Sequence, residues 1–195
     1  GSGVRIEDEA GKSYVDFGTG IATCPLGHCH PIIRTALEQQ AAELIHTSNL
    51  YHIRQQALLA EHIVEQIVEE PGRVFFCNSG AEANEAAIKL ARKHGHTRRG
   101  IERPVILTAT ASFHGRTLAA VTATGQPKYH QGFEPVVDGF DYVPYNDLEA
   151  FESCLNRHEA AGPSVAAVLI EPLQGEGGVC LLYTSPSPRD VTPSR

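Results

Sequence analysis

The sequence predicts an α/β fold with a largely parallel sheet and flanking helices. Apolar segments of strand length alternate with longer helical patterns along most of the 195 residues. Three polar or Gly-containing motifs each follow a predicted strand, at residues 79–81, 113–116 and 171–178. Because parallel α/β sheets bind ligands at the carboxyl ends of their strands, we expect these motifs to meet at one site.

The first 70 residues combine a predicted hairpin with two helices. Residues 4–17 alternate apolar and polar character around a turn at 8–12, which indicates two paired strands. After a Gly-rich irregular stretch, Pro31 suits the first turn of a helix that runs through Leu44. Apolar residues at helical spacing predict a second helix over residues 55–68.

Residues 74–93 contain the strongest local signal. A short apolar run at 74–77 predicts a buried strand, and an Ala-rich helical pattern follows Ser79 and Gly80. Ser79 is a good N-cap, and Gly80 lets the backbone approach a ligand closely. The free N–H groups of Ser79, Gly80 and Ala81 therefore suit a phosphate. Physical reasoning alone leaves an ordinary capped helix as an equal alternative.

The rest of the chain continues the alternation of strands and helices. Propensity does not decide between helix and strand for residues 118–123. Asn146 or Asp147 is expected to cap a later helix, which runs through residue 155. The predicted elements are a loop at 95–103, a strand at 105–109, a long loop at 125–135, a strand at 142–145, a helix through 155 and a buried strand at 165–170.

Composition excludes several classes of function. A net charge of −7 argues against a nucleic-acid partner, and no apolar run is long enough to span a membrane. Five cysteines without framework spacing and no signal pattern favour reduced thiols and a cytoplasmic location. The Cys and His residues at 24–30 lack a second ligand pair, so no metal site is predicted.

Residues 78–86, Asn-Ser-Gly-Ala-Glu-Ala-Asn-Glu-Ala, resemble the phosphate-binding motif of class III aminotransferases, which use pyridoxal 5′-phosphate (PLP). The resemblance extends from about Val4 to Val179 and includes Gly-His-Cys-His-Pro at 27–31. Gly-Gln-Pro-Lys-Tyr at 125–129 is similar to the acetylornithine, succinylornithine and ornithine branch. The resemblance implies fold type I of the PLP-dependent transferases, with only part of the sheet present.

The resemblance also implies a division of the chain. Residues 1–54 are expected to form the N-terminal segment of the small domain and an active-site loop, and residues 55–179 part of the large PLP-binding domain. From Cys180 the composition becomes rich in Ser and Pro, so residues 180–195 are expected to be a non-native or disordered tail that packs on nothing. A natural Pro-rich linker is the alternative.

Site residues follow from the same resemblance. The expected cofactor-binding residues are Ser79, Gly80, Ala81, Phe113, His114 and Glu171, with Phe113 stacked on the PLP ring. The expected substrate-binding residues are Arg116 on the α-carboxylate, Glu176 paired with a second arginine, and Tyr51. The alternatives are that Phe113 is a core residue, Arg116 a structural ion-pair partner and Tyr51 a packed loop aromatic.

The implied activity is transfer of the terminal amino group of N-acetylornithine or a close relative to 2-oxoglutarate through PLP, in a homodimer, giving glutamate and a semialdehyde. Its partners are then small amino acids and 2-oxo acids. The chain's only lysines, Lys12, Lys89, Lys93 and Lys128, do not match the Schiff-base lysine of the family, so the 195 residues alone are expected to be inactive. A PLP aminomutase and a non-catalytic phosphate-binding or interaction module are the alternatives.

Overall fold

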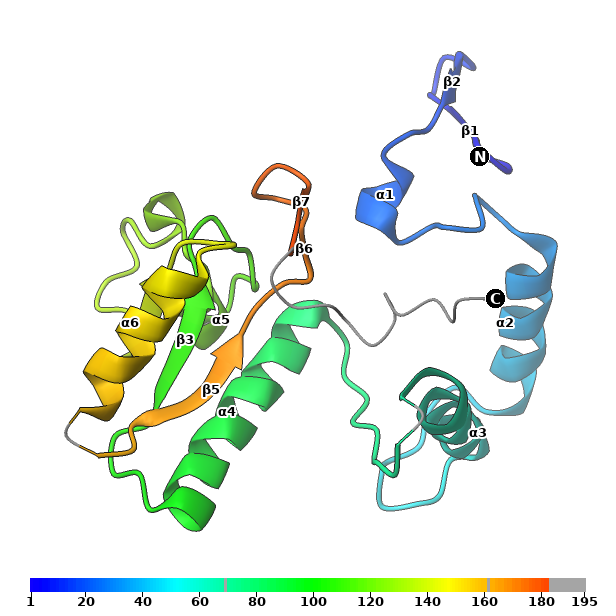
Figure 1. Cartoon of the computed structure of the whole chain (residues 1–195). Helices are drawn as coiled ribbons and strands as arrows, with labels where there is room; N and C mark the ends of the chain where they lie inside the picture. Colours follow the sequence, from blue (N-terminus) through cyan, green and yellow to red (C-terminus); the bar gives the residue numbers. More distant parts are fainter. Residues whose placement is uncertain (69, 161, 183–195) are drawn as a thin grey trace, which may run out of the picture. The chain divides into compact units, whose positions relative to one another are not determined.

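The computed structural model describes residues 1–68, 70–160 and 162–182 (Figure 1). Contacts divide the chain into two units, with the boundary between Val74 and Phe75. The sequence-based division placed its first boundary after residue 54. In the structure the helix that begins at Arg54 therefore belongs to the first unit.

The first unit contains the expected hairpin and helices. Its strands pair antiparallel, and the carboxylate of Asp8 shapes the turn by accepting the amide of Lys12 at 2.9 Å. The second predicted helix ends in a π-helical turn. The elements are β1 (Arg5–Glu7), β2 (Ser13–Val15), α1 (Thr19–Ala22), α2 (Pro31–Glu43), α3 (Arg54–Ile63) and η1 (Val64–Val68).

Apolar side chains of the first unit are widely exposed. Phe17 is 93% exposed and Ile21 95%, and none of the unit's described residues is fully buried. His28 is held locally, because its Nε2 lies 2.7 Å from a carboxylate oxygen of Asp16. The helices and hairpin of this unit thus form without a closed apolar core among the described residues.

The second unit contains the parallel sheet. The described residues give it three strands in the order β4-β3-β5, all parallel, which confirms the predicted fold class. The elements are α4 (Gly80–Arg99), β3 (Val105–Ala109), α5 (Leu118–Ala123), η2 (Pro127–Tyr129), β4 (Phe140–Val143), α6 (Leu148–Glu159), β5 (Val165–Leu169), β6 (Leu173–Gln174) and β7 (Cys180–Leu181).

Helices cover both faces of this sheet, with α4 and α6 on opposite sides (Figure 1). Successive residues of β3 point to opposite faces, as the period of a strand requires. Leu107 packs with Val143 and with Cys154 of α6, whereas Ile106 packs with Ile88 of α4. The sheet and the helices on its two faces therefore form a three-layer core. This core holds the loops at the carboxyl edge of the sheet.

The predicted buried strand at 74–77 is wrong. The structure has no strand there, and the side chain of Phe75 is 72% exposed. A strand exists only when a neighbour supplies ladder hydrogen bonds, and no described segment pairs with these residues. The apolar run alone could not reveal whether such a neighbour is present.

The helix that follows is longer than predicted. Residues 95–99, predicted as part of a loop, belong to α4, which ends where Gly100 adopts a left-handed φ of 66°. Gly95 lies inside the helix and is buried, and a Cβ there would lie 3.2 Å from the Cβ of Ala166. The glycine therefore lets α4 approach β5 closely instead of ending the helix.

The expectation that the tail is disordered and packs on nothing is wrong for its first residues. Cys180 and Leu181 form β7, which pairs antiparallel with β6, and the Nδ2 of Asn146 donates to the carbonyl of Leu181 at 2.8 Å. Backbone pairing does not depend on the polar composition from which disorder was predicted. Residues 183–195, the rest of the predicted tail, lie outside the described residues.

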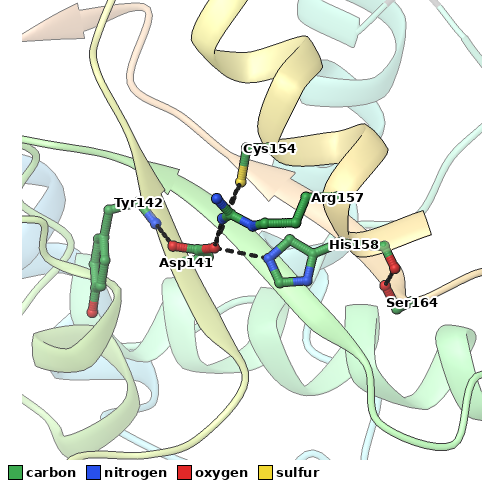
Figure 2. A network of polar contacts seen from close by, with 6 residues as sticks. All are labelled: Asp141, Tyr142, Cys154, Arg157, His158 and Ser164. Atoms are coloured by element: carbon green, nitrogen blue, oxygen red, sulfur yellow. Dashed lines mark hydrogen bonds and ion pairs between the residues drawn. The ribbon is translucent and has the colours of Figure 1, made fainter. Parts of the chain in front are cut away.

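Asp141 joins β4 to α6 (Figure 2). Its Oδ2 lies 2.5 Å from a guanidinium nitrogen of Arg157 and 2.8 Å from Nε2 of His158, and the thiol of Cys154 lies 3.6 Å away. Burial raises the pKa of Asp141, but hydrogen bonds from His158, the Tyr142 amide and Arg157 outweigh it and lower the pKa. Although Asp, Cys and His could ligate a metal, the guanidinium of Arg157 already supplies a positive charge to this cluster.

Candidate functional site

The first turn of α4 is open to an anion. Ser79 caps the helix as predicted, because its Oγ accepts the amide of Glu82 at 3.2 Å. In the described part of the chain no acceptor faces the amides of Gly80 and Ala81, and a Cβ on Gly80 would meet nothing within 4 Å. Unpaired N–H groups at the positive end of a 20-residue helix can hold a phosphate or carboxylate.

The loop after β3 packs directly on this helix start. Gly115 has a φ of +135°, and a Cβ at that position would lie 2.8 Å from the Cβ of Ala81. The side-chain amide of Asn84 donates to the carbonyl of His114 at 2.7 Å. Two of the three predicted motifs are thereby brought together, although they are about 30 residues apart in the sequence.

Glu85 of α4 holds the end of the loop that follows β3, where α5 begins. Its Oε1 accepts the hydroxyl of Thr117 at 2.5 Å and the amides of Ala119 and Ala120 at 3.0 and 3.1 Å. One carboxylate of α4 therefore caps the start of α5. Lys89 lies four residues after Glu85 on α4, a spacing that favours ion pairs in helices, but no ion pair joins the two among the described residues.

The third motif reaches the site through Glu171, just after β5. Its carboxylate accepts the amide of Phe113 at 3.2 Å, and its carbonyl accepts the hydroxyl of Tyr145 at 2.8 Å. Burial raises the pKa of Glu171, and the hydrogen bond from Phe113 offsets this only in part. Glu171 thus fixes the backbone that presents the Phe113 ring.

His114 faces the core of the unit. The residue is 5% exposed, and its Nε2 lies 3.0 Å from Oγ1 of Thr108. Its amide donates to Oγ1 of Thr124 at 2.9 Å. Burial lowers the pKa of His114 to about 4, so the imidazole is neutral at physiological pH. The side chain supports the loop from below.

Arg116 and Glu176 both contact Tyr129. The guanidinium carbon of Arg116 lies 4.7 Å from the Tyr129 ring centroid and 5.8 Å from that of Phe113. The Tyr129 hydroxyl donates to Oε1 of Glu176 at 2.6 Å, and Nζ of Lys128 lies 4.0 Å from the same oxygen. Arg116 is an exposed cation without a hydrogen-bond acceptor in the described part of the chain.

The site residues therefore fall into one group and one outlier. All predicted residues from Ser79 onward belong to the second unit, where contacts link the three motifs. Tyr51 belongs to the first unit and is 69% exposed. Sequence reasoning missed Asn84 and Tyr129, although the long loop at 125–135 marked the region of Tyr129.

Comparison with known proteins identifies the family. Residues 1–185 match the family model of class-III aminotransferases, and the chain belongs to this family. It is similar to the acetylornithine aminotransferases of Prochlorococcus marinus (strain MIT 9313), at 64% identity, and Thermosynechococcus vestitus, at 59% identity, each over 179 residues. Those alignments cover 92% of this chain but only 42% and 43% of the relatives.

Solved structures give the same family and fold. The ornithine aminotransferase of Toxoplasma gondii, whose structure contains PLP at partial occupancy in its active site, matches with a TM-score of 0.84 at 32% identity. That match covers 94% of this chain and 42% of the other. N-acetylornithine aminotransferase of Stenotrophomonas maltophilia matches with a TM-score of 0.70 at 38% identity, covering 92% and 42%. Class III aminotransferases use PLP.

No helix in the described ranges is both long enough and apolar enough to cross a membrane.

Proposed function

We propose that this chain forms the N-terminal part of an aminotransferase that moves the terminal amino group of N-acetylornithine, or of a close relative, to 2-oxoglutarate. The observation that carries the proposal is the packing of Gly115 on Ala81. It places an anion-binding helix start beside a loop that presents an aromatic ring and an arginine, and this arginine has no hydrogen-bond acceptor among the described residues. Two relatives that share 64% identity with this chain over 179 residues are named acetylornithine aminotransferases.

The second unit supplies the groups that would hold PLP. The amides of Gly80 and Ala81, with Ser79 beside them, are free to bind its phosphate. Phe113 would stack on the PLP ring, held in place by the bond from its amide to Glu171. His114 would act by fixing this loop from the core. Bound PLP supplies an electron-withdrawing ring that stabilises negative charge on the substrate.

The remaining residues would bind the substrate. The planar guanidinium of Arg116 can bind the α-carboxylate through two parallel hydrogen bonds. Glu176 would pair with a second arginine and so let one pocket accept both a basic amine and glutamate, and Tyr51 would be a further substrate-binding residue. The partners are then amino acids and 2-oxo acids, and the complete protein is proposed to be a homodimer.

The 195-residue chain alone is proposed to be inactive. Lys12 lies by the hairpin, Lys89 and Lys93 lie along α4, and the ammonium of Lys128 lies near Glu176. None of these lysines matches the one that holds PLP covalently in the family. The purified chain, incubated with PLP and dialysed, should give no glutamate from acetylornithine and 2-oxoglutarate. Turnover above a protein-free control would refute this.

The activity itself is tested on a completed polypeptide. Residues 1–179 can be joined to the C-terminal remainder of the Prochlorococcus marinus relative, and the chimera assayed with acetylornithine, succinylornithine and ornithine. We expect glutamate formation, and Arg116→Ala should raise the amino-acid KM about tenfold or more, the cost of a charge-assisted bidentate contact. Arg98→Ala, at the exposed end of α4, is the matched control. Absence of transamination with all three donors would overturn the proposal.

A further inference from the structure

The ring of Tyr129 lies between three charged side chains. Its hydroxyl donates to Glu176 at 2.6 Å, and its ring centroid is 4.7 Å from the guanidinium carbon of Arg116 and 4.7 Å from Nζ of Lys128. Phe113 packs edge-on against the same ring, with centroids 5.8 Å apart. Tyr129 thus contacts both side chains to which the proposed function assigns substrate binding.

The contact between the Tyr129 ring and Arg116 leaves the guanidinium available for hydrogen bonds to a ligand. A cation held against an aromatic ring is fixed without giving up its N–H donors as hydrogen bonds. Consistent with this, no ion pair or hydrogen bond engages the Arg116 guanidinium within the described ranges. The ring therefore orients the guanidinium and leaves its hydrogen-bonding edge for a carboxylate.

The hydroxyl of Tyr129 acts on Glu176 in a different way. Glu176 is exposed and lies in the Gly-rich turn between β6 and β7, so little else in its surroundings restricts its carboxylate. A bond of 2.6 Å from Tyr129 and the ammonium of Lys128 at 4.0 Å together hold one of its oxygens. The second oxygen has no such partner among the described residues and can accept a further donor.

We propose that Tyr129 is a positioning residue that sets substrate specificity through both neighbours. Its ring orients Arg116 toward the α-carboxylate, and its hydroxyl holds Glu176 in the position in which the proposed pocket accepts the basic amino donor. The proposal rests on the proposed function, because that function gives Arg116 and Glu176 their substrate contacts. A residue that only stabilised the loop would affect stability but would not separate the two substrates.

Two substitutions separate the two actions. Tyr129→Phe keeps the ring against Arg116 and removes the bond to Glu176, whereas Tyr129→Leu removes both. Tyr14→Phe is the matched control, because Tyr14 lies in the hairpin of the first unit and bonds to Asp8. In the completed polypeptide, Tyr129→Phe should raise the KM for acetylornithine about tenfold, leave kcat nearly unchanged and leave the KM for glutamate unchanged.

Tyr129→Leu should raise the KM for both substrates, by about fivefold for glutamate. A readout on the 195-residue chain does not depend on activity. The NMR signal of the Arg116 Nε–H group, assigned with Arg116→Lys, should carry a ring-current shift that Tyr129→Phe keeps and Tyr129→Leu abolishes. Added 2-oxoglutarate should move this signal, and Tyr129→Leu should require about fivefold more of it.

The outcomes distinguish the two proposals. If the chimera fails with every amino donor, the proposed function fails, and the NMR titration still decides whether Tyr129 orients Arg116 for a carboxylate. If Tyr129→Phe raises both KM values equally or neither, or if Tyr129→Leu leaves the Arg116 signal and its titration unchanged, the role of Tyr129 is overturned.

Discussion

Gly115 and Ala81 are in contact at a distance that excludes any side chain at position 115. A Cβ there would lie 2.8 Å from the Cβ of Ala81 and 3.0 Å from that of Ala120. The backbone of the loop after β3 therefore lies directly on the first turn of α4. This contact joins the anion-binding start of α4 and the loop that carries Phe113 and Arg116 into one site.

Gly115→Ala should therefore destabilise the second unit by about 2–4 kcal/mol, since it combines a strained positive φ with overlap against Ala81. Gly132→Ala is the matched control, because Gly132 has a φ of +85° but open space around its Cβ. Urea unfolding of the two variants measures the difference. Equal losses of stability would show that the close approach to Ala81 contributes nothing.

Glu85→Ala should loosen the start of α5. The substitution removes the acceptor of Thr117 and of two backbone amides, and the expected cost is about 1–2 kcal/mol. Glu85→Gln keeps an acceptor oxygen and should cost less. Hydrogen exchange of the Ala119 and Ala120 amides reports the effect locally, with Glu152→Ala on the exposed face of α6 as the control. Unchanged exchange would contradict the capping role.

His114 should make stability depend on pH. Its pKa is lowered from 6.5 to about 4 in the folded chain, so the unfolded chain binds a proton at a pH where the folded chain does not. The contribution of neutral His114 to the free energy of unfolding is complete above about pH 6.5. It is lost as the pH falls toward 4, and the loss is about 1–3 kcal/mol. His114→Gln should flatten this part of the profile of unfolding free energy, and the exposed His94→Gln should not. Parallel profiles for wild type and His114→Gln would contradict the assignment.

Asp141→Asn should weaken the link between β4 and α6 shown in Figure 2. Loss of the charge-assisted bonds to Arg157 and His158 should cost about 1–2 kcal/mol near neutral pH. Because the folded-state pKa of Asp141 is lowered, its contribution is present above the unfolded value of 3.8 and is lost as the pH falls through the folded value. Thermal unfolding of the variant and wild type at pH 7 should differ clearly, and Asp138→Asn serves as a comparison. A difference no larger than that of the comparison would refute the role.

Elements whose signals lie in neighbouring residues were predictable from the amino-acid sequence. Ser79 as an N-cap, the proline start of α2 and the alternation of apolar segments follow from neighbouring residues, so the hairpin, most helices and the parallel sheet were predictable. The same reasoning misjudged residues 74–77 and 95–99, because a strand depends on a partner and a buried helical glycine on the neighbouring strand.

The way in which the motifs combine depends on tertiary contacts. Contacts such as Gly115 with Ala81, Glu171 with Phe113 and Tyr129 with Glu176 join residues 34 to 58 positions apart, and no periodicity within one element encodes them. The burial of His114 is likewise a property of the closed layers, since solvent exclusion arises only when β3 and α5 pack around it. Local sequence therefore fixed which groups the site contains, and packing fixed which of them face a ligand and which face the core.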